Sequence, residues 1–122
     1  MLNFLRPSGG NRVERIAPQD AVAKAKAGAL TVIDVREGME VKSSGKAKGA
    51  LHIPLATIRM KADPSSPEKH PDLDPAKPVA LYCASGGRSA GAAQMLVQMG
   101  YAEVYNIGGL GDWHAGGGEI ER

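Results

Sequence analysis

Residues 79–99, VALYCASGGRSAGAAQMLVQM, decide the fold that we expect for this chain. The apolar run Val79–Tyr82 is typical of a buried strand, and Arg88–Met99 has the composition of a helix that Gly100 ends. The chain's only cysteine, Cys83, stands between the two elements. A strand, a tight loop and a helix in succession form the basic unit of an α/β fold.

Strands and helices alternate over most of the remaining chain. Further strands are predicted at Val13–Ile16, Leu30–Ile33, Ala50–Ile53 and Glu103–Asn106, and helices at Gln19–Ala27, Leu55–Ala62 and Gly109–His114. Polar residues 37–48 have room only for a short helix, and residues 63–78, with five of the eight prolines, are expected to form a long surface loop. The pattern predicts an α/β fold with a central, mostly parallel five-stranded sheet and helices on both faces.

Length and composition bound the possible functions. A chain of 122 residues with 43% apolar residues is the usual size of one domain. We expect residues 1–11 to be a flexible leader and residues 12–122 to form that domain. The 15 basic and 13 acidic residues are spread along the chain, which argues against nucleic acid as a partner.

Compartment and assembly are also suggested by the sequence. No apolar run reaches membrane-spanning length, and the first residues lack the apolar core of a signal peptide. A single cysteine cannot form an internal disulfide. We therefore expect a cytoplasmic protein with no membrane partner, and the polar surface and short leader favour a monomer.

Cys83 is predicted to lie at the carboxyl end of a central strand, where α/β sheets bind their ligands. The residues after it have no bulky side chains, so their N–H groups can form an anion-binding nest at the start of the next helix. Such surroundings lower the pKa of a thiol and make it a nucleophile. Arg88 adds a cation at the rim, and Ser85 and Ser89 are candidate hydroxyl donors. The predicted substrate-binding loop consists of Ala84, Ser85, Gly86, Gly87, Arg88 and Ser89.

A buried, unreactive cysteine in an ordinary strand-to-helix turn is the simplest alternative for Cys83. The arginine and serine that follow at the helix start favour catalysis instead. From these residues alone, both a thiolate phosphatase and a sulfurtransferase stay open.

Four segments in the same order resemble the single-domain rhodanese family of thiosulfate sulfurtransferases. They are VIDVRE (Val32–Glu37), GALHIP (Gly49–Pro54), LYCASGGRSA (Leu81–Ala90) and NIGGLGDW (Asn106–Trp113). The resemblance extends over Val13–Gly116 and implies a rhodanese-like fold with Cys83 as the catalytic residue.

The resemblance also implies a chemistry. Four residues separate Cys83 from Arg88, as in sulfurtransferases, whereas related dual-specificity phosphatases and arsenate reductases have one more. Cys83 would take sulfur from a small sulfur-containing anion, thiosulfate or a persulfide, become a persulfide, and pass the sulfur to a thiol or cyanide. A sulfur-carrier protein is a further candidate partner, and no cofactor is implied.

Charged residues outside the loop have secondary roles in this interpretation. Asp34 and Arg36 are predicted to be structural, tying a strand end to a neighbouring loop. The resemblance makes Arg59 and Lys61 candidates for holding an anionic donor, with a solvated helix face as the alternative.

The histidines and the remaining lysines carry weaker signals. His52, His70 and His114 offer no metal-ligand spacing. The basic loop residues Lys42, Lys46 and Lys48 could meet an acidic partner or simply be solvated. The family's usual histidine is missing from Gly45–Ala50, so we expect altered packing near Lys46.

Two other function classes stay open. A small phosphatase or arsenate reductase on the same fold would hydrolyse an aryl phosphate or turn over arsenate. A non-catalytic module would carry sulfur or bind a partner without turnover of its own.

Overall fold

The computed structural model describes residues 12–122 and contains a central sheet of five strands in the order β1-β6-β5-β2-β4. The expected leader, residues 1–11, lies outside the described residues. Every neighbouring pair of strands in this sheet is parallel, which confirms the predicted fold class. The strands are β1 (Val13–Arg15), β2 (Thr31–Asp34), β4 (Leu51–His52), β5 (Val79–Cys83) and β6 (Val104–Gly109).

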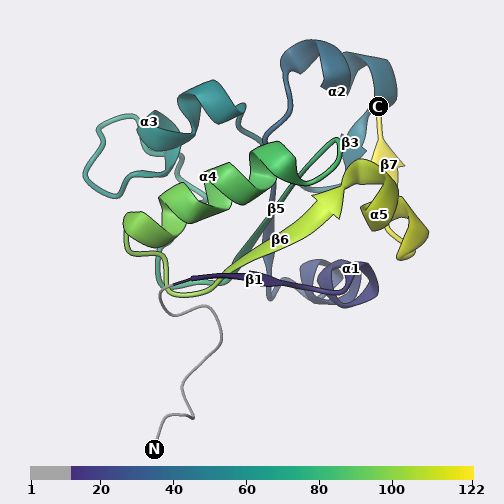
Figure 1. Cartoon of the computed structure of the whole chain (residues 1–122), viewed down its shortest axis with the longest axis horizontal. Coiled ribbons are helices and arrows are strands. Elements are labelled where there is room, and N and C mark those ends of the chain that lie inside the picture. Colours follow the sequence, from purple (N-terminus) through teal and green to yellow (C-terminus); the bar gives the residue numbers. More distant parts are fainter. Residues whose placement is uncertain (1–11) are drawn as a thin grey trace, which may run out of the picture.

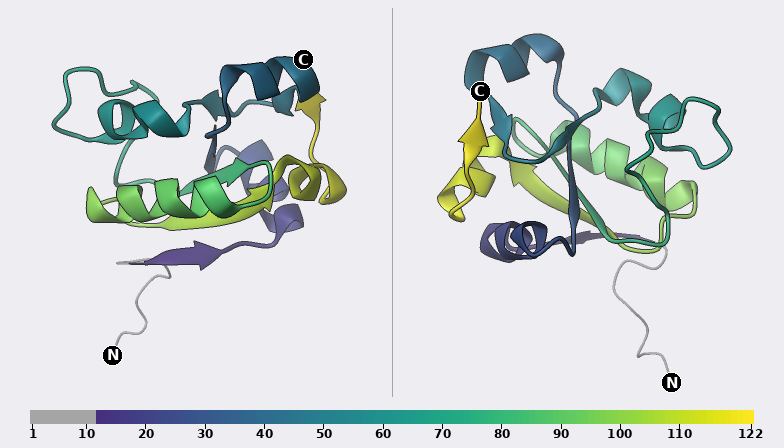
Figure 2. Two further views of the ribbon diagram at one scale, coloured as in Figure 1. Left: turned by 45° about the horizontal axis from the view of Figure 1, so that its top comes forward. Right: turned by 180° about the vertical axis from the view of Figure 1, so that it is seen from behind.

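Helices cover both faces of the sheet (Figure 1). One face carries α1 (Pro18–Lys26) and α5 (Leu110–Ala115), and the other carries α3 (Ile58–Ala62) and α4 (Gly87–Gln98). Figure 2 shows the same layers from two further directions. A short 3-10 turn, η1 (Leu55–Thr57), leads into α3.

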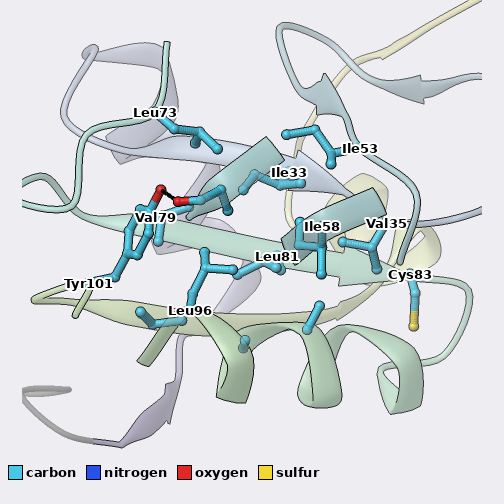
Figure 3. Packing of buried hydrophobic residues seen from close by; sticks show 14 residues of the cluster. Ile33, Val35, Ile53, Ile58, Leu73, Val79, Leu81, Cys83, Leu96 and Tyr101 are labelled. Atoms are coloured by element: carbon cyan, nitrogen blue, oxygen red, sulfur yellow. Dashed lines mark hydrogen bonds between the residues drawn. The ribbon is translucent and has the colours of Figure 1, made fainter. Parts of the chain in front are cut away.

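Each face of the sheet builds its own apolar cluster, because successive strand residues point to opposite sides. Ile33 and Leu81 pack with Leu96 of α4 on one face (Figure 3). Val32 packs in the second cluster with Trp113 of α5. All five residues of β5 are buried, as expected for the central strand of a sheet that is covered on both faces.

Two short strands that the sequence analysis did not predict form a second sheet. β3 (Lys46–Ala47) pairs antiparallel with β7 (Ile120–Glu121), which brings the end of the chain beside α2 (Gly38–Ser44; Figure 1). Lys46 Nζ donates to the Glu121 carboxylate. Strands of two residues have no periodicity that a sequence pattern can reveal, so both were missed.

Two other segments have the structure that the sequence predicted. Residues 37–48 contain the short helix α2, whose first turn is capped by the N–H of Glu37 donating to the Glu40 carboxylate at 2.9 Å. No residue of α2 is buried. Residues 63–78 contain neither helix nor strand, and Leu73, which is 2% exposed, anchors this loop to the core.

Candidate active site

Cys83 ends β5 at the carboxyl edge of the sheet and is only 1% exposed. A register shift in β6 beside Leu81 sets Cys83 opposite Gly109. α4 begins at Gly87, and the preceding Gly86 has a φ of +107°, a conformation that favours glycine. The turn from strand to helix therefore wraps around the cysteine side chain, which Figure 3 shows at one end of the apolar cluster.

The Sγ atom of Cys83 accepts hydrogen bonds from the loop that follows it. The N–H of Gly86 donates at 3.0 Å, and the buried hydroxyl of Ser89 donates at 3.5 Å. Burial by itself raises the pKa of this thiol, but the hydroxyl and N–H of Ser89 and the N–H groups of Ser85 and Gly86 lower it to about 7. A pKa near neutrality means that the thiolate, the nucleophilic form, is populated at neutral pH.

The predicted loop acts mainly through its backbone. Ala84, Ser85 and Gly87 are exposed, whereas Ser89 is fully buried. Of the two serines that the sequence singled out, Ser89 reaches Cys83 with its hydroxyl and Ser85 with its N–H. N–H groups of the loop thus donate to the Cys83 sulfur, as the predicted anion-binding nest requires.

Arg88 faces a partner that the sequence analysis missed. Its Nη1 donates to Glu40 Oε2 at 2.6 Å and its Nη2 to Glu40 Oε1 at 2.8 Å, so the two planar groups meet edge to edge. The pair lowers the pKa of Glu40 to about 2 and raises that of Arg88, to which the Cys83 sulfur also contributes. Glu40 lies 48 positions before Arg88, and no local pattern indicates such a contact.

Asn106 of β6 fixes the loop from the other side. Its Nδ2 donates to the carbonyl of Gly86 at 3.1 Å. Its Oδ1 accepts the hydroxyl of Ser89 at 2.8 Å and the N–H of Gly108 at 3.1 Å. Asn106 belongs to the NIGGLGDW motif, but its role could not be predicted from the sequence, because these hydrogen bonds join elements that are distant in the chain.

Glycine at position 109 is required by close packing against the cysteine loop. A Cβ atom there would stand 2.2 Å from the carbonyl oxygen of Ala84. The N–H of Gly109 donates to Asp112 at 2.8 Å, which caps α5. The end of β6 therefore sets the position of the first loop residue after Cys83.

Asp34 and Arg36 form a buried ion pair with each other, whereas the sequence predicted only that they tie the strand end to a neighbouring loop. Arg36 Nη2 and Asp34 Oδ2 are 2.8 Å apart, and the Tyr82 hydroxyl donates to the same carboxylate oxygen at 2.6 Å. Arg36 also donates to Ser44 Oγ at 2.8 Å and to the carbonyl of Gly45. The pair ties β2 to the end of α2 and does not contact Cys83 in the interactions that the structure describes.

Arg59 and Lys61 lie on α3. Arg59 is exposed, and its charge acts on Asp63 at the end of the same helix. Within residues 12–122, no hydrogen bond or ion pair joins either side chain to the cysteine loop. Their role as donor-binding residues stays a prediction.

Two of the three lysines predicted to form a basic loop pair with acidic residues near the C-terminus. Lys46 pairs with Glu121 and Lys48 with Glu119, whereas Lys42 is exposed on α2. These pairs join the loop to the end of the chain, so two of the three charges are offset.

One cavity beside the sheet touches the cysteine loop, and another lies on the side of α1 and α5. The larger of the two, about 500 Å³, is lined by Val22 of α1, Val32 of β2 and Trp113 of α5, among others. The smaller, about 450 Å³, is lined by loop residues 85–87 together with Arg15 of β1. This cavity adjoins the backbone of the loop, and Cys83, Arg88 and Glu40 are not among its lining residues.

The histidines are held by backbone groups. The Nε2 atom of His52 lies 2.8 Å from the carbonyl oxygen of Arg36, and the Nδ1 atom of His70 accepts the N–H of Asp72 at 3.1 Å. In the described part of the chain, no group of three or more His, Cys, Asp or Glu side chains is placed to hold a metal ion. None of its helices is long and apolar enough to span a membrane.

Solved and curated proteins resemble this chain. It is 37% identical over 91 residues to the uncharacterized protein YqhL of Bacillus subtilis (strain 168), an alignment that covers 74% of this chain and 63% of that relative's length. A structure from Rhodopseudomonas palustris CGA009, described as a protein of unknown function and possible tyrosine phosphatase, is 36% identical. It has a TM-score of 0.80, and the match covers 89% of this chain and 85% of that one.

A second structure is described as rhodanese with anions, from E. coli. It is 33% identical with a TM-score of 0.56, over 69% of this chain and 91% of that one. The family model for the rhodanese-like domain matches residues 17–116, which include the whole cysteine loop and its partners in α2 and β6. The chain therefore belongs to the family of rhodanese-like domains.

Proposed function

We propose that this chain is a sulfurtransferase that carries transferable sulfur as a persulfide on Cys83. The observation that carries the proposal is the set of donors on Sγ, in which the N–H of Gly86 and the hydroxyl of Ser89 converge on a buried sulfur atom. These donors favour the anionic form of the sulfur, with a thiol pKa of about 7. An anionic sulfur in a nest of N–H groups is both a nucleophile and a stable persulfide carrier.

In the first half-reaction the Cys83 thiolate attacks the outer sulfur of thiosulfate. A new sulfur–sulfur bond forms while the one within thiosulfate breaks, and sulfite leaves with the electron pair of the broken bond. The protein is left as the Cys83 persulfide anion, and total charge is conserved without a cofactor. The N–H groups of loop residues 84–89 are the donors available to the outer sulfur.

In the second half-reaction an acceptor attacks that outer sulfur. Cyanide leaves as thiocyanate, or a thiolate leaves as a persulfide, and the electron pair of the broken bond returns to Cys83 as thiolate. Since the donor product departs before the acceptor reacts, the scheme is ping-pong.

Donor, acceptor and setting belong to the same proposal. The donor is thiosulfate or a persulfide, and the acceptor is cyanide, a small thiol or a sulfur-carrier protein. The chain acts as a monomer in the cytoplasm, without nucleic acid or membrane. Arg59 and Lys61 of α3 are the candidates for guiding an anionic donor to the mouth of the site.

Phosphate ester hydrolysis is the second candidate, because the Rhodopseudomonas palustris structure is described as a possible tyrosine phosphatase. Two features argue against it. Only four residues separate Cys83 from Arg88, and the expectation for phosphatases and arsenate reductases is one more. The Nη1 and Nη2 groups of Arg88, which could bind a phosphate through two hydrogen bonds, already donate to the Glu40 carboxylate.

Turnover assays test the proposal. Thiocyanate formation from thiosulfate and cyanide is measured for the wild type and for Cys83→Ser, beside hydrolysis of p-nitrophenyl phosphate and reduction of arsenate. The proposal expects thiocyanate from the wild type alone and neither of the other reactions. Phosphate release that depends on Cys83, without thiocyanate, would replace the proposal by the phosphatase, and no turnover of any substrate would favour a binding module.

A further inference from the structure

The positively charged Arg88, which follows the cysteine loop, is paired with a negatively charged side chain. Arg88 and Glu40 meet through two hydrogen bonds of 2.6 and 2.8 Å, and their side chains are 35% and 33% exposed. A two-point contact between a guanidinium and a carboxylate fixes the orientation of both groups. The formal charge of the pair is zero.

Two other cations of the described chain lie near this pair or the loop. Arg15 lines a cavity together with loop residues 85–87, and two carboxylates, Glu14 and Asp112, line the same cavity. Arg36, which acts on Glu40, is itself paired with buried Asp34. The loop residues Ala84–Gly87 carry no charged side chains. On the side of Arg88, a ligand that approaches Cys83 therefore meets backbone N–H groups and the amino end of α4, while the carboxylate of Glu40 offsets the charge of Arg88.

The net charge of the side chains near Cys83 affects how fast a donor with a second negative charge can react. The thiolate already repels an incoming anion, and each further charge on the donor adds to this repulsion. An unpaired arginine would compensate for that extra charge. A paired one compensates for it much less, although its Nε and remaining N–H groups still can donate hydrogen bonds.

We propose that Glu40 is a specificity-determining residue, which makes the site favour sulfur donors with a single negative charge over dianions. The inference rests on the proposed sulfurtransferase function for its substrate class. Monoanionic thiosulfonates and persulfides ionised only at their sulfur are the donors that fit, and thiosulfate is the disfavoured one. Glu40 does not touch the donor and acts through Arg88.

Alkylation of Cys83 tests the charge effect without any sulfur transfer. Iodoacetate and iodoacetamide differ by one negative charge, and the chain has one cysteine, so the ratio of their rates reports on the field at Cys83. Glu40→Gln removes the charge and keeps the size and an acceptor oxygen of the side chain. Because Glu37 is exposed at the start of the same helix and makes no ion pair with Arg88 in the described structure, Glu37→Gln is the matched control.

The expected change follows from Coulomb's law. One charge acting on another across about 8 Å, with an effective dielectric constant of about 40, changes a rate ratio about five-fold. Glu40→Gln should therefore raise the iodoacetate-to-iodoacetamide ratio about five-fold, while Glu37→Gln changes it by less than about two-fold. A purely structural role for Glu40 would alter both reagents equally. An unchanged ratio in Glu40→Gln overturns the inference, whatever the function of the chain.

Two sulfur donors carry the test to the reaction itself. Thiosulfate is a dianion and methanethiosulfonate is a monoanion. Each transfers its outer sulfur to the thiolate, and sulfite or methanesulfinate leaves. In Glu40→Gln the kcat/KM for thiosulfate should rise about five-fold relative to that for methanethiosulfonate. An equal change for both donors overturns the inference. If neither donor reacts with the wild type while the alkylation ratio still moves, the proposed function fails and the charge effect of Glu40 stands.

Discussion

Ser89→Ala removes the side-chain hydroxyl that acts on the Cys83 sulfur. The hydroxyl lies 3.5 Å from Sγ and 2.8 Å from the amide oxygen of Asn106, so its single proton has two acceptors. When Cys83 ionises, the proton is drawn towards the negative sulfur. Without the hydroxyl the thiolate loses one of its donors, and the pKa of Cys83 must rise.

The size of the effect follows from the geometry. A hydrogen bond to a charged group contributes about 1.5–3 kcal/mol, and the long, shared contact of Ser89 belongs at the lower end of that range. About 1.5 kcal/mol corresponds to an upward move of about one pH unit in the ionisation midpoint of Cys83. At pH 7 the thiolate fraction then falls about five-fold. Asn106 keeps the N–H of Gly108 as a donor at 3.1 Å, so no buried acceptor is left unpaired.

The assay is the rate of alkylation by iodoacetamide between pH 5 and pH 10, since the only cysteine is Cys83. The wild type should show a midpoint near pH 7, the value to which the loop lowers the pKa of the thiol. Ser85→Ala is the matched control, because Ser85 acts through its N–H and should leave the midpoint in place. Equal midpoints for the wild type and Ser89→Ala would refute the reasoning.

Three further predictions concern stability and the shape of the loop. The folded state lowers the pKa of Cys83 from 9.0 to about 7. The ionised thiol should therefore stabilise the protein fully above pH 9, and this contribution should be lost as the pH falls through 7. The difference in the free energy of unfolding between the wild type and Cys83→Ser, measured in urea across this pH range, tests the prediction. Gly109→Ala places a methyl group 2.2 Å from the Ala84 carbonyl oxygen, so the cysteine loop must shift. The N–H donors then move away from the Cys83 sulfur, and alkylation of Cys83 at pH 7 should slow by about ten-fold. An alkylation rate equal to that of the wild type would contradict this prediction. Tyr82→Phe removes the 2.6 Å donor to buried Asp34 and should lower the free energy of unfolding by about 2 kcal/mol, again measured in urea.

The local parts of this structure could be predicted from the sequence. The strand–loop–helix unit around Cys83 follows from an apolar run, two glycines and a run of helix formers, all within 21 consecutive residues. The donors on its sulfur belong to the same loop, so the nest and the lowered pKa also follow from neighbours in sequence. Asp34 and Arg36, two positions apart, were predicted to be structural, but their pairing with each other was not predicted. The catalytic role of Cys83 stays a prediction.

Interactions between distant segments could not be predicted in this way. Glu40 meets Arg88 across 48 positions and Lys46 meets Glu121 across 75, and each contact depends on how several elements pack. The role of Asn106 is of the same kind, since its partners are on a different element. Sequence patterns report on local conformation and burial, whereas these contacts arise only when the sheet order is fixed.

The most direct test of the central claim is the intact mass of the reduced protein after incubation with a sulfur donor, thiosulfate or methanethiosulfonate. The wild type should gain the mass of one sulfur atom, and cyanide should remove it with release of thiocyanate. Cys83→Ser should gain nothing. A wild-type protein that stays at its original mass with both donors, while Cys83 still reacts with iodoacetamide, would contradict the persulfide mechanism.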